Sequence, residues 1–404
     1  MKKKFWIRAV VVFILLVAFR AATSSIAPLI NNLLTEMGYT FERQAIVSGV
    51  ILAVGYIASI FGSMIGGRFA DKMGPVKTIM IAGSIFAAAF ILWAILDNAI
   101  LFSFNRTLLA LCSGALYVAL QSYLLGGVKK GSEGMAMGIY GLGFGVGTAL
   151  AGTAAGVADQ FGINEVFITL GVVCVGAVLL GRIMTLFERK IPVPGDFIPA
   201  MKENEKAISL KQVLKGARGS IYVLLINAVV YGFGLIIFLQ YLDELGAARG
   251  MPGTQAAFGI AVFSIISLMQ PVSGLIADKI GKMTCIVIGQ ILVAIGWGAL
   301  ALMPGLSMGI VLALSAVAGV GSALFSPAVL AVAEISAAPG SGGTLRGVYQ
   351  GATNIGSAAA AMFGSLVYKG INGIDKVFVL LLISCCAGMA TAVWLAGLVR
   401  KESL

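Results

Sequence analysis

The chain has 404 residues, of which 59% are hydrophobic and 11% are charged, and its mean hydropathy is +1.00. These values exclude an ordinary water-soluble globular domain and indicate a membrane protein. The formal net charge is +11, but the basic residues gather in particular loops between apolar stretches, so we predict no nucleic-acid partner.

Apolar stretches of about 20 residues, each long enough to cross a bilayer core as a helix, recur along nearly the whole chain. Such helices satisfy their own backbone hydrogen bonds, and the alternating segments of about 10 residues that build a membrane barrel are absent. The sequence therefore predicts an all-α membrane protein. Its twelve predicted transmembrane helices cover residues 8–30, 45–67, 76–96, 99–126, 135–158, 166–187, 219–241, 254–277, 283–303, 307–333, 346–368 and 377–398.

Most of the basic residues lie on one side of these spans. The other side holds only Arg43, Arg249, Lys369 and Lys376. By the positive-inside rule, both termini are predicted to lie in the cytoplasm, and the chain to be a multi-pass protein of the cytoplasmic (inner) membrane of a prokaryote. The basic residues of the predicted inner side are Lys2, Lys3, Lys4, Arg8, Arg68, Lys72, Lys77, Lys129, Lys130, a central group from Arg182 to Arg218, Lys279, Lys282, Arg346, Arg400 and Lys401.

The first residues, MKKKFWIRAVVVFILLVAF, combine a basic start with an apolar run and also resemble a signal peptide. No clear small-x-small cleavage site follows, and removal of this segment would leave an odd number of spans. We therefore expect it to be the first transmembrane helix.

The cysteines fall within or at the ends of predicted spans, so we expect packing residues rather than a disulfide framework. The chain has no histidine, which is the commonest metal ligand and a frequent proton relay. We accordingly predict no metal site and no cofactor. The five cysteines are Cys112, Cys174, Cys285, Cys385 and Cys386.

The longest hydrophilic stretch, residues 188–218, has six predicted spans before it and six after it. It divides the chain into an N-terminal six-helix bundle (1–187), a cytoplasmic central loop (188–218) and a C-terminal six-helix bundle (219–404). The end of the loop, ISLKQVLKGA, is predicted to form a short amphipathic helix at the membrane surface.

The two halves repeat each other. GGRFADKMG (66–74) recurs as SGLIADKIG (273–281), at an offset of 207 residues, and GIYGLGFGVGTALAG (138–152) recurs as GVYQGATNIGSAAAA (347–361), at an offset of 209. Two bundles related by duplication are expected to enclose a cavity at their interface, near the middle of the bilayer. The pairs in the first repeat are Gly67 with Gly274, Asp71 with Asp278, Lys72 with Lys279 and Gly74 with Gly281.

The twelve spans, the central loop and the Gly-x-x-x-Asp-Lys-x-Gly loop after the second and eighth spans resemble the major facilitator superfamily of secondary transporters. The resemblance implies that the residues of both loops help to close the inner side, with Asp71 near the start of the eleventh span and Asp278 near the start of the fifth. A carboxylate there accepts hydrogen bonds from free backbone N–H groups and is stabilised by the helix dipole. Because Pro75 and Val76 replace the usual basic pair, we expect the amino-terminal loop to hold less strongly.

The segment RTLLALCSG (106–114) resembles the family pattern Arg-x-Leu-x-Gly-x-Gly-x-Gly of the fourth span, with Ala110 and Cys112 at positions where glycine is common. The fifth span lacks the Gly-Pro pair that marks many drug/proton antiporters of the family. This absence argues against multidrug efflux.

Two arginines are predicted to lie inside the membrane. Arg20 is about 18 Å into the first span, near the middle of a core of about 30 Å, and Arg106 is about 10 Å from the outer end of the fourth. A guanidinium cannot deprotonate there, and leaving it unpaired costs about 3 kcal/mol. No carboxylate is evident at comparable depth, so we predict that an anionic substrate supplies the missing charge, or else that Arg20 bonds to polar groups of a neighbouring helix.

The first span, FRAATSSIAPLI, also resembles that of the cyanate and nitroimidazole permease group. Arg20, Ser24 or Ser25, Pro28 and Leu29 fit that pattern, whereas Ala18, Ala21 and Ala27 depart from it. The resemblance implies a small anion as the substrate.

Polar residues that share a helix face are further candidates for substrate binding, and interhelical packing is the alternative for each. Gln350, Thr353 and Asn354 form a stripe that the fifth span lacks. The remaining candidates are Ser24, Tyr117, Gln121, Asn227 and Tyr231, and Gln270-Pro271 and Ser326-Pro327 are predicted kinks.

The sequence thus predicts a secondary active transporter that moves a small organic or pseudohalide anion by alternating access. Coupling would be to protons, with Glu334 as the candidate acid, or by exchange. The alternative is proton-driven efflux of drugs or other amphiphilic compounds. We expect no enzymatic activity, because no nucleophile with a base is evident, and we expect a monomer whose partners are the lipid bilayer and the anionic substrate.

Overall fold

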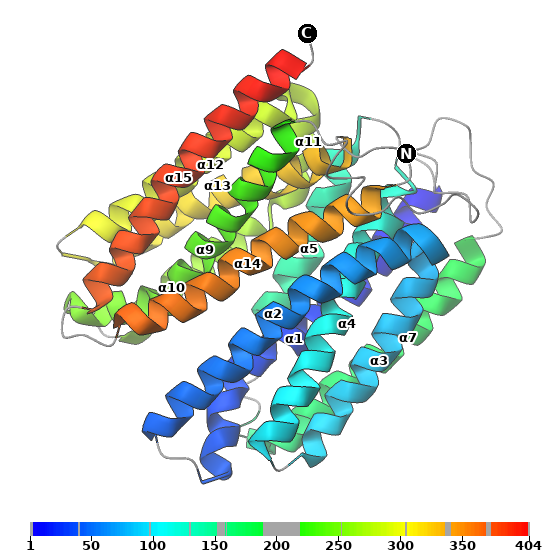
Figure 1. Cartoon of the computed structure of the whole chain (residues 1–404), viewed down its shortest axis with the longest axis horizontal. Coiled ribbons are helices and arrows are strands. Elements are labelled where there is room, and N and C mark those ends of the chain that lie inside the picture. Colours follow the sequence, from blue (N-terminus) through cyan, green and yellow to red (C-terminus); the bar gives the residue numbers. More distant parts are fainter. Residues whose placement is uncertain are drawn as a thin grey trace. The chain divides into compact units, whose positions relative to one another are not determined.

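The computed structural model describes residues 3–38, 41–96, 98–128, 131–151, 158, 160–188, 219–251, 253–303, 305–335, 341–368 and 373–402. The regular structure of these residues is helical throughout (Figure 1), which confirms the predicted fold class. Among the described residues, ten helices are long and apolar enough to cross a membrane, and one bent pair gives up to eleven such spans. The chain is therefore a multi-pass membrane protein, while the orientation of its termini stays a prediction.

Each predicted span in the first half corresponds to a helix, although several helices are longer than the apolar run within them. The helices are α1 (Lys3–Glu36), α2 (Phe41–Met73), α3 (Pro75–Leu92) with the short 3-10 helix η1 (Trp93–Ile95), α4 (Ala99–Leu125), α5 (Glu133–Ala151) and α7 (Ile163–Glu188). Glu188, which the sequence assigns to the central loop, is the last residue of α7. Residues 189–218, including the predicted amphipathic helix, lie outside the described residues.

The second half begins with α9 (Gly219–Ala248) and ends with α15 (Gly373–Glu402). Between them lie α10 (Gly253–Ser267), α11 (Gln270–Ile280), α12 (Lys282–Leu302), α13 (Met308–Ile335) and α14 (Gly342–Tyr368). Helix α14 is the predicted eleventh span, but it is rich in glycine, alanine and polar residues and is not among the helices apolar enough to cross a membrane. Its composition suits a helix that packs against protein on most sides.

The predicted eighth span is broken into α10 and α11, which bend by 48°. Pro271 lies in the first turn of α11, where its missing N–H leaves no hydrogen bond unmade. This confirms the predicted kink at Gln270-Pro271. The other predicted kink lies within α13, which continues as one helix through Pro327.

The chain divides into two compact units. Unit 1 comprises Met1–Gly131, Leu142–Leu210 and Ala337–Gly351, and unit 2 comprises Ser132–Gly141, Lys211–Ser336 and Ala352–Leu404. The first turns of α5 therefore pack with unit 2 and the first turns of α14 with unit 1. Division of the chain at 188–218 stays a prediction, because most of that segment lies outside the described residues.

Each unit has an aromatic core. In unit 1 a chain of ring contacts joins α1, α3, η1, α4 and α7, and in unit 2 a second chain joins α9, α10, α12 and α13. Such edge-to-face and offset contacts bury a large area and fix the helix spacing. The rings of unit 1 are Phe19, Phe86, Phe90, Trp93, Phe102 and Phe167, and those of unit 2 are Tyr231, Phe238, Phe263, Trp297 and Phe325.

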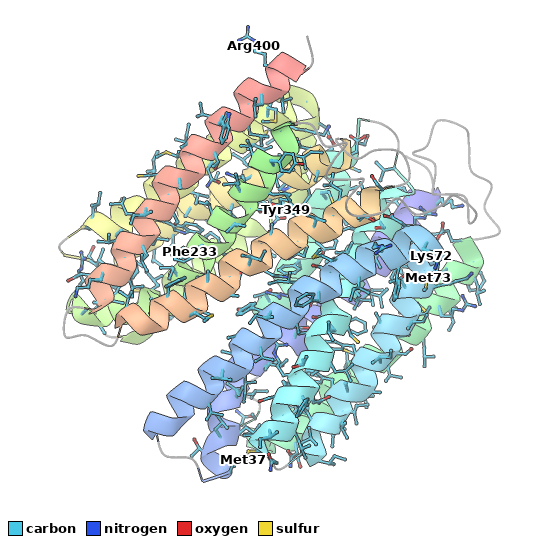
Figure 2. All side chains as sticks on the ribbon, viewed as in Figure 1. Met37, Lys72, Met73, Phe233, Tyr349 and Arg400 are labelled. Atoms are coloured by element: carbon cyan, nitrogen blue, oxygen red, sulfur yellow. The ribbon has the colours of Figure 1, made fainter. Side chains whose placement is uncertain are left out.

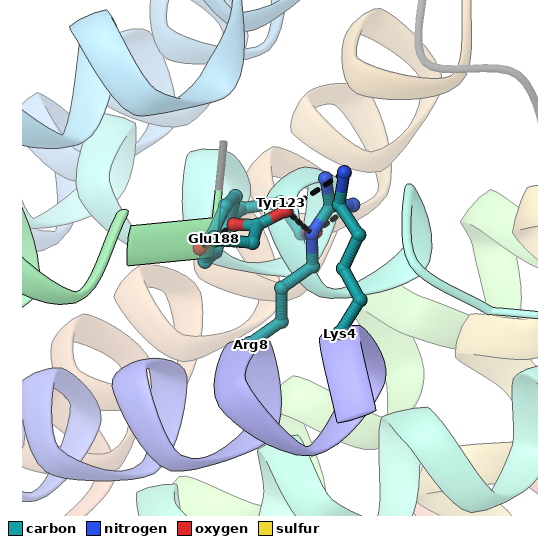
Figure 3. Close-up of polar contacts among 4 residues, drawn as sticks. All are labelled: Lys4, Arg8, Tyr123 and Glu188. Carbon is teal, nitrogen blue, oxygen red and sulfur yellow. Dashed lines mark hydrogen bonds and ion pairs between the residues drawn. The ribbon is translucent and has the colours of Figure 1, made fainter. Parts of the chain in front are cut away.

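A buried ionic cluster joins α1, α4 and α7 at one end of unit 1 (Figure 3). Glu188 Oε1 accepts a hydrogen bond from Arg8 Nε at 2.7 Å and lies 3.6 Å from Lys4 Nζ, and Glu188 Oε2 accepts one from the Tyr123 hydroxyl. The Arg8 guanidinium also donates to the Tyr123 carbonyl oxygen at 3.1 Å and lies over the Tyr123 ring. The carboxylate at the end of α7 thus compensates two cations of α1.

We expect Glu188→Ala to lower the free energy of unfolding by about 3 kcal/mol, because it leaves two partly buried cations without their counter-charge. Denaturant unfolding of the purified protein in detergent would measure the change. Glu165→Ala is the matched control, since Glu165 is an exposed carboxylate at the other end of α7, and its effect should stay within about 0.5 kcal/mol. Equal effects of the two substitutions would contradict a stabilising role for the cluster.

Candidate functional site

The first copy of the repeated loop motif lies at the end of α2, against the start of α14. Asp71 accepts hydrogen bonds from the backbone N–H groups of Gly343 at 2.9 Å and Thr344 at 2.7 Å, and from the Thr344 hydroxyl at 2.7 Å. A side chain at Gly67 would overlap the Gly343 carbonyl oxygen, so the close approach of the two helices requires glycine there. Asp71 therefore caps α14, as the family resemblance implies for the eleventh span.

The second copy lies in unit 2, where α11 meets the start of α5. Asp278 accepts hydrogen bonds from the N–H groups of Gly134 and Met135, both at 3.0 Å. A side chain at Gly274 would overlap the Gly134 carbonyl oxygen, which repeats the arrangement at Gly67. In this copy Lys282 adds a charge, since its Nζ lies 3.3 Å from both Asp278 Oδ1 and Glu133 Oε2.

The remaining motif residues have the same place in both copies. Gly74 and Gly281 adopt φ values of 88° and 103°, which side chains other than glycine rarely adopt. Lys72 and Lys279 are exposed, and Figure 2 shows Lys72 at the end of α2. The role of these residues in closing the inner side stays a prediction.

The two copies differ in the cation beside the aspartate. Pro75 stands at the position of Lys282, so the first residue of α3 carries no charge. Instead, Arg346 of α14 interacts electrostatically with Asp71, and its Nη2 donates to the Ser122 hydroxyl of α4 at 2.7 Å. Arg346 thus supplies a positive charge to the amino-terminal loop. The expectation that this loop holds less strongly rests on Pro75 and Val76 alone and does not include Arg346.

Arg20 is held by two residues of α5. Its Nε donates to the Thr148 hydroxyl at 2.9 Å, and its Cζ lies 4.0 Å from the centroid of the Phe144 ring. Gly147 allows this approach, because a Cβ there would lie 2.7 Å from Arg20 Cβ. Arg20 Nε therefore bonds to a polar group of a neighbouring helix, which is the alternative that the sequence left open. The two terminal nitrogens of Arg20 donate no hydrogen bond to any described residue.

Arg106 is buried in α4 against α2. A Cβ on Gly55 would lie 2.6 Å from Arg106 Nε, so the guanidinium occupies the space that a side chain at residue 55 would fill. Its Nε and Nη1 are buried and have no hydrogen-bond partner among the described residues. The positive charge of Arg20 acts on it, whereas no carboxylate acts on it within the part of the chain that is described. The two arginines therefore lie close enough to repel each other and share a region without an acid.

The other polar candidates of unit 1 lie on α1 and α4. The Tyr117 hydroxyl donates to the Thr23 hydroxyl at 3.1 Å, and the Tyr117 ring packs edge-to-face on Phe144 at 5.7 Å. The Ser24 hydroxyl is buried without a hydrogen-bond partner among the described residues, and so is Gln121 Oε1. Thr23, Phe144 and Thr148 were missed in the sequence, because their contacts depend on how α1, α4 and α5 cross.

The structure does not bring the candidates of α9 together. Asn227 donates to the Thr391 hydroxyl at 2.8 Å and to the Gly388 carbonyl oxygen at 3.2 Å, both in α15. Tyr231 instead shares a hydrogen bond of 2.7 Å with Ser322 of α13. These contacts are the interhelical packing that the sequence left open as the alternative, and a role in binding stays a prediction for both residues.

The stripe on α14 consists of partly buried Gln350 and Thr353 and buried Asn354. The side chain of Glu334, the candidate for proton coupling, lies outside the described residues, so its role stays a prediction. Among the described residues, no three histidine, cysteine, aspartate or glutamate side chains gather as metal ligands.

We expect Gly67→Ala to lower the free energy of unfolding by about 1–3 kcal/mol, because the new methyl group overlaps the start of α14 and forces α2 away from it. Thermal unfolding in detergent would measure the loss. Gly176→Ala on α7 is the control, since a Cβ there meets no atom within 4 Å. If Gly67→Ala were as stable as the control, the close contact between α2 and α14 would be absent in solution.

Two relatives with similar sequences are named as multidrug resistance proteins. Multidrug resistance protein MdtG of Rahnella sp. (strain Y9602) is 26% identical over 113 residues, so the match covers 28% of this chain and 27% of that protein. Multi-drug resistance efflux pump PmrA of Streptococcus pneumoniae serotype 4 (strain ATCC BAA-334 / TIGR4) is 25% identical over 280 residues, which are 67% of each chain. The chain thus spans about a quarter of the length of MdtG.

Solved structures share the fold at low identity. The human organic anion transporter MFSD10 (TETRAN) superposes with a TM-score of 0.76 and 14% identity, over 98% of this chain and 100% of that chain. The proton:xylose symporter XylE superposes with the same score and identity, over 96% of this chain and 94% of that chain. The family model of the Major Facilitator Superfamily matches residues 11–361 and 224–403. The chain therefore belongs to the major facilitator superfamily, and it is a transporter rather than an enzyme.

Proposed function

We propose that the protein is a secondary transporter of a small organic anion, whose negative charge is bound by Arg20 and Arg106. The observation that carries the proposal is the buried Arg106 guanidinium, two of whose nitrogens have no acceptor among the described residues. A guanidinium in the bilayer interior needs an acceptor or a counter-ion. A transported anion supplies both at the moment of binding, and its departure restores the repulsion between the arginines.

The arrangement of Arg20 supports the same proposal. Thr148 and Phe144 fix the orientation of its guanidinium without neutralising its charge. A preorganised cation loses less entropy when it binds an anion than a mobile one does. Thr148 and Phe144 therefore leave Arg20 charged and in place for a ligand.

A second candidate is proton-driven export of drugs, which the names of the two efflux relatives favour. Both relatives are below 30% identical, and the shared segments do not identify a substrate. The two candidates differ in the charge of the ligand, since a site with two arginines and no described acid repels lipophilic cations. A thermal-stability screen of the purified protein against carboxylates, inorganic anions and lipophilic cations separates them, because a ligand that binds the folded state raises its stability.

We expect Arg20→Ala to weaken anion binding at least about 30-fold, because truncation of a charged hydrogen-bonding partner costs about 2 kcal/mol or more. Anion transport into proteoliposomes should then fall below detection, and Arg20→Lys should impair it, since lysine keeps the charge but lacks the planar fork. Arg182→Ala on the exposed face of α7 is the control for loss of one arginine. Undiminished transport by correctly folded Arg20→Ala would refute the proposed role.

A further inference from the structure

We propose, on the basis of the function proposed above, that the anion is a carboxylate attached to an aromatic ring. Two groups of observations carry this inference. One is the set of donors that Arg20 leaves free, and the other is the pair of aromatic rings that lie beside it.

The free donors of Arg20 match a carboxylate. Its Nε is bound to Thr148 and one face of its guanidinium lies on the Phe144 ring, so the edge formed by its two terminal nitrogens remains. That edge presents parallel N–H groups, which a carboxylate accepts with both oxygens. A halide or a linear pseudohalide has no second oxygen to complete this pair of hydrogen bonds.

The rings beside Arg20 match an aromatic group. Phe144 of α5 and Tyr117 of α4 meet edge-to-face, with centroids 5.7 Å apart and planes 67° apart. The Tyr117 ring is held in place by its hydrogen bond to Thr23. Aromatic rings at such angles offer edges and faces on which a further ring packs favourably. A carboxylate bound to Arg20 would hold its substituent next to these rings.

The contact between Arg20 and Phe144 occurs in only one of the two copies of the repeat. A Cβ on Gly147 would contact Val17 O and Ala21 N, and a Cβ on Gly356 would contact Val229 O and Phe233 N, so α1 and α9 correspond at an offset of 212 residues (229 − 17 and 233 − 21).

At this offset Arg20 corresponds to Gly232, and Phe144 corresponds to Thr353 at the offset of the fifth and eleventh spans. Gly232 does pack against Thr353, as Arg20 does against Phe144. The fold thus preserves the contact between these helices, while the arginine and the ring are present only in the first copy. Packing of the fold does not require them, which points to a ligand.

The inference is tested by the affinities of the purified full-length protein for benzoate, acetate and thiocyanate, measured by calorimetric titration in detergent. We expect benzoate to bind at least about tenfold more tightly than acetate, because the ring adds aromatic contacts and buried apolar area. Thiocyanate should bind more weakly than benzoate, because it cannot engage both terminal nitrogens of Arg20.

Two variants separate the ring contacts from the charge. Phe144→Leu should reduce the ratio of benzoate to acetate affinity, because it removes the ring and keeps an apolar side chain. Thr148→Val should weaken both carboxylates by a similar factor and leave the ratio unchanged, because it loosens Arg20 without touching the rings. If Phe144→Leu left the ratio unchanged, the aromatic part of the inference would be refuted.

The outcomes also distinguish this inference from the function on which it rests. Equal affinities for benzoate, acetate and thiocyanate, all lost in Arg20→Ala, would overturn the aromatic carboxylate and leave anion transport standing. No binding of any of the three anions, together with binding of lipophilic cations, would overturn both.

Discussion

The loss of water around buried and partly buried arginines is the physical constraint on which the rest of the account depends. A guanidinium keeps its charge in the bilayer interior, so each one needs acceptors or a counter-charge from its surroundings. Arg8 finds the carboxylate of Glu188, and Arg346 finds a serine hydroxyl and a nearby aspartate. Arg20 is only partly compensated, and two nitrogens of Arg106 have no described acceptor. The compensated arginines join neighbouring helices, and we propose that the uncompensated ones bind a ligand.

The glycines make the helix contacts of both loops possible. The hydrogen bonds of Asp71 and Asp278 require the starts of α14 and α5 to approach α2 and α11 more closely than side chains would allow. At each contact a glycine on one helix faces backbone atoms of the other. Because a capped helix start and a facing glycine occur in both copies, the duplication preserves the packing. The copies differ in the cation beside the aspartate, which is Arg346 of α14 in the first copy and Lys282 of α12 in the second.

Much of this arrangement could be predicted from the sequence. Most of the predicted spans follow from apolar runs, whereas the eleventh, α14, is rich in glycine, alanine and polar residues. The pairing of Asp71 with the start of the eleventh span follows from the repeat and the family resemblance. The kink at Gln270-Pro271 follows from the chemistry of proline, and the kink at Ser326-Pro327, within α13, stays a prediction. These features depend on local composition or on a repeated pattern, which one sequence contains.

The contacts of single side chains could not be predicted, because they depend on helix crossings that bring distant residues together. Glu188 lies 180 residues from Arg8, at the edge of a hydrophilic stretch where a solvated carboxylate is expected. The stacking of Arg20 on Phe144 depends on the crossing of α1 and α5. This contact supports an aromatic carboxylate as the proposed ligand. The most direct test compares the binding of benzoate and benzamide, which differ in charge but not in the ring. We predict that benzoate binds at least about tenfold more tightly, since charge-assisted hydrogen bonds to the arginines are lost in the amide. Equal binding of the two would contradict the claim that these arginines select an anion.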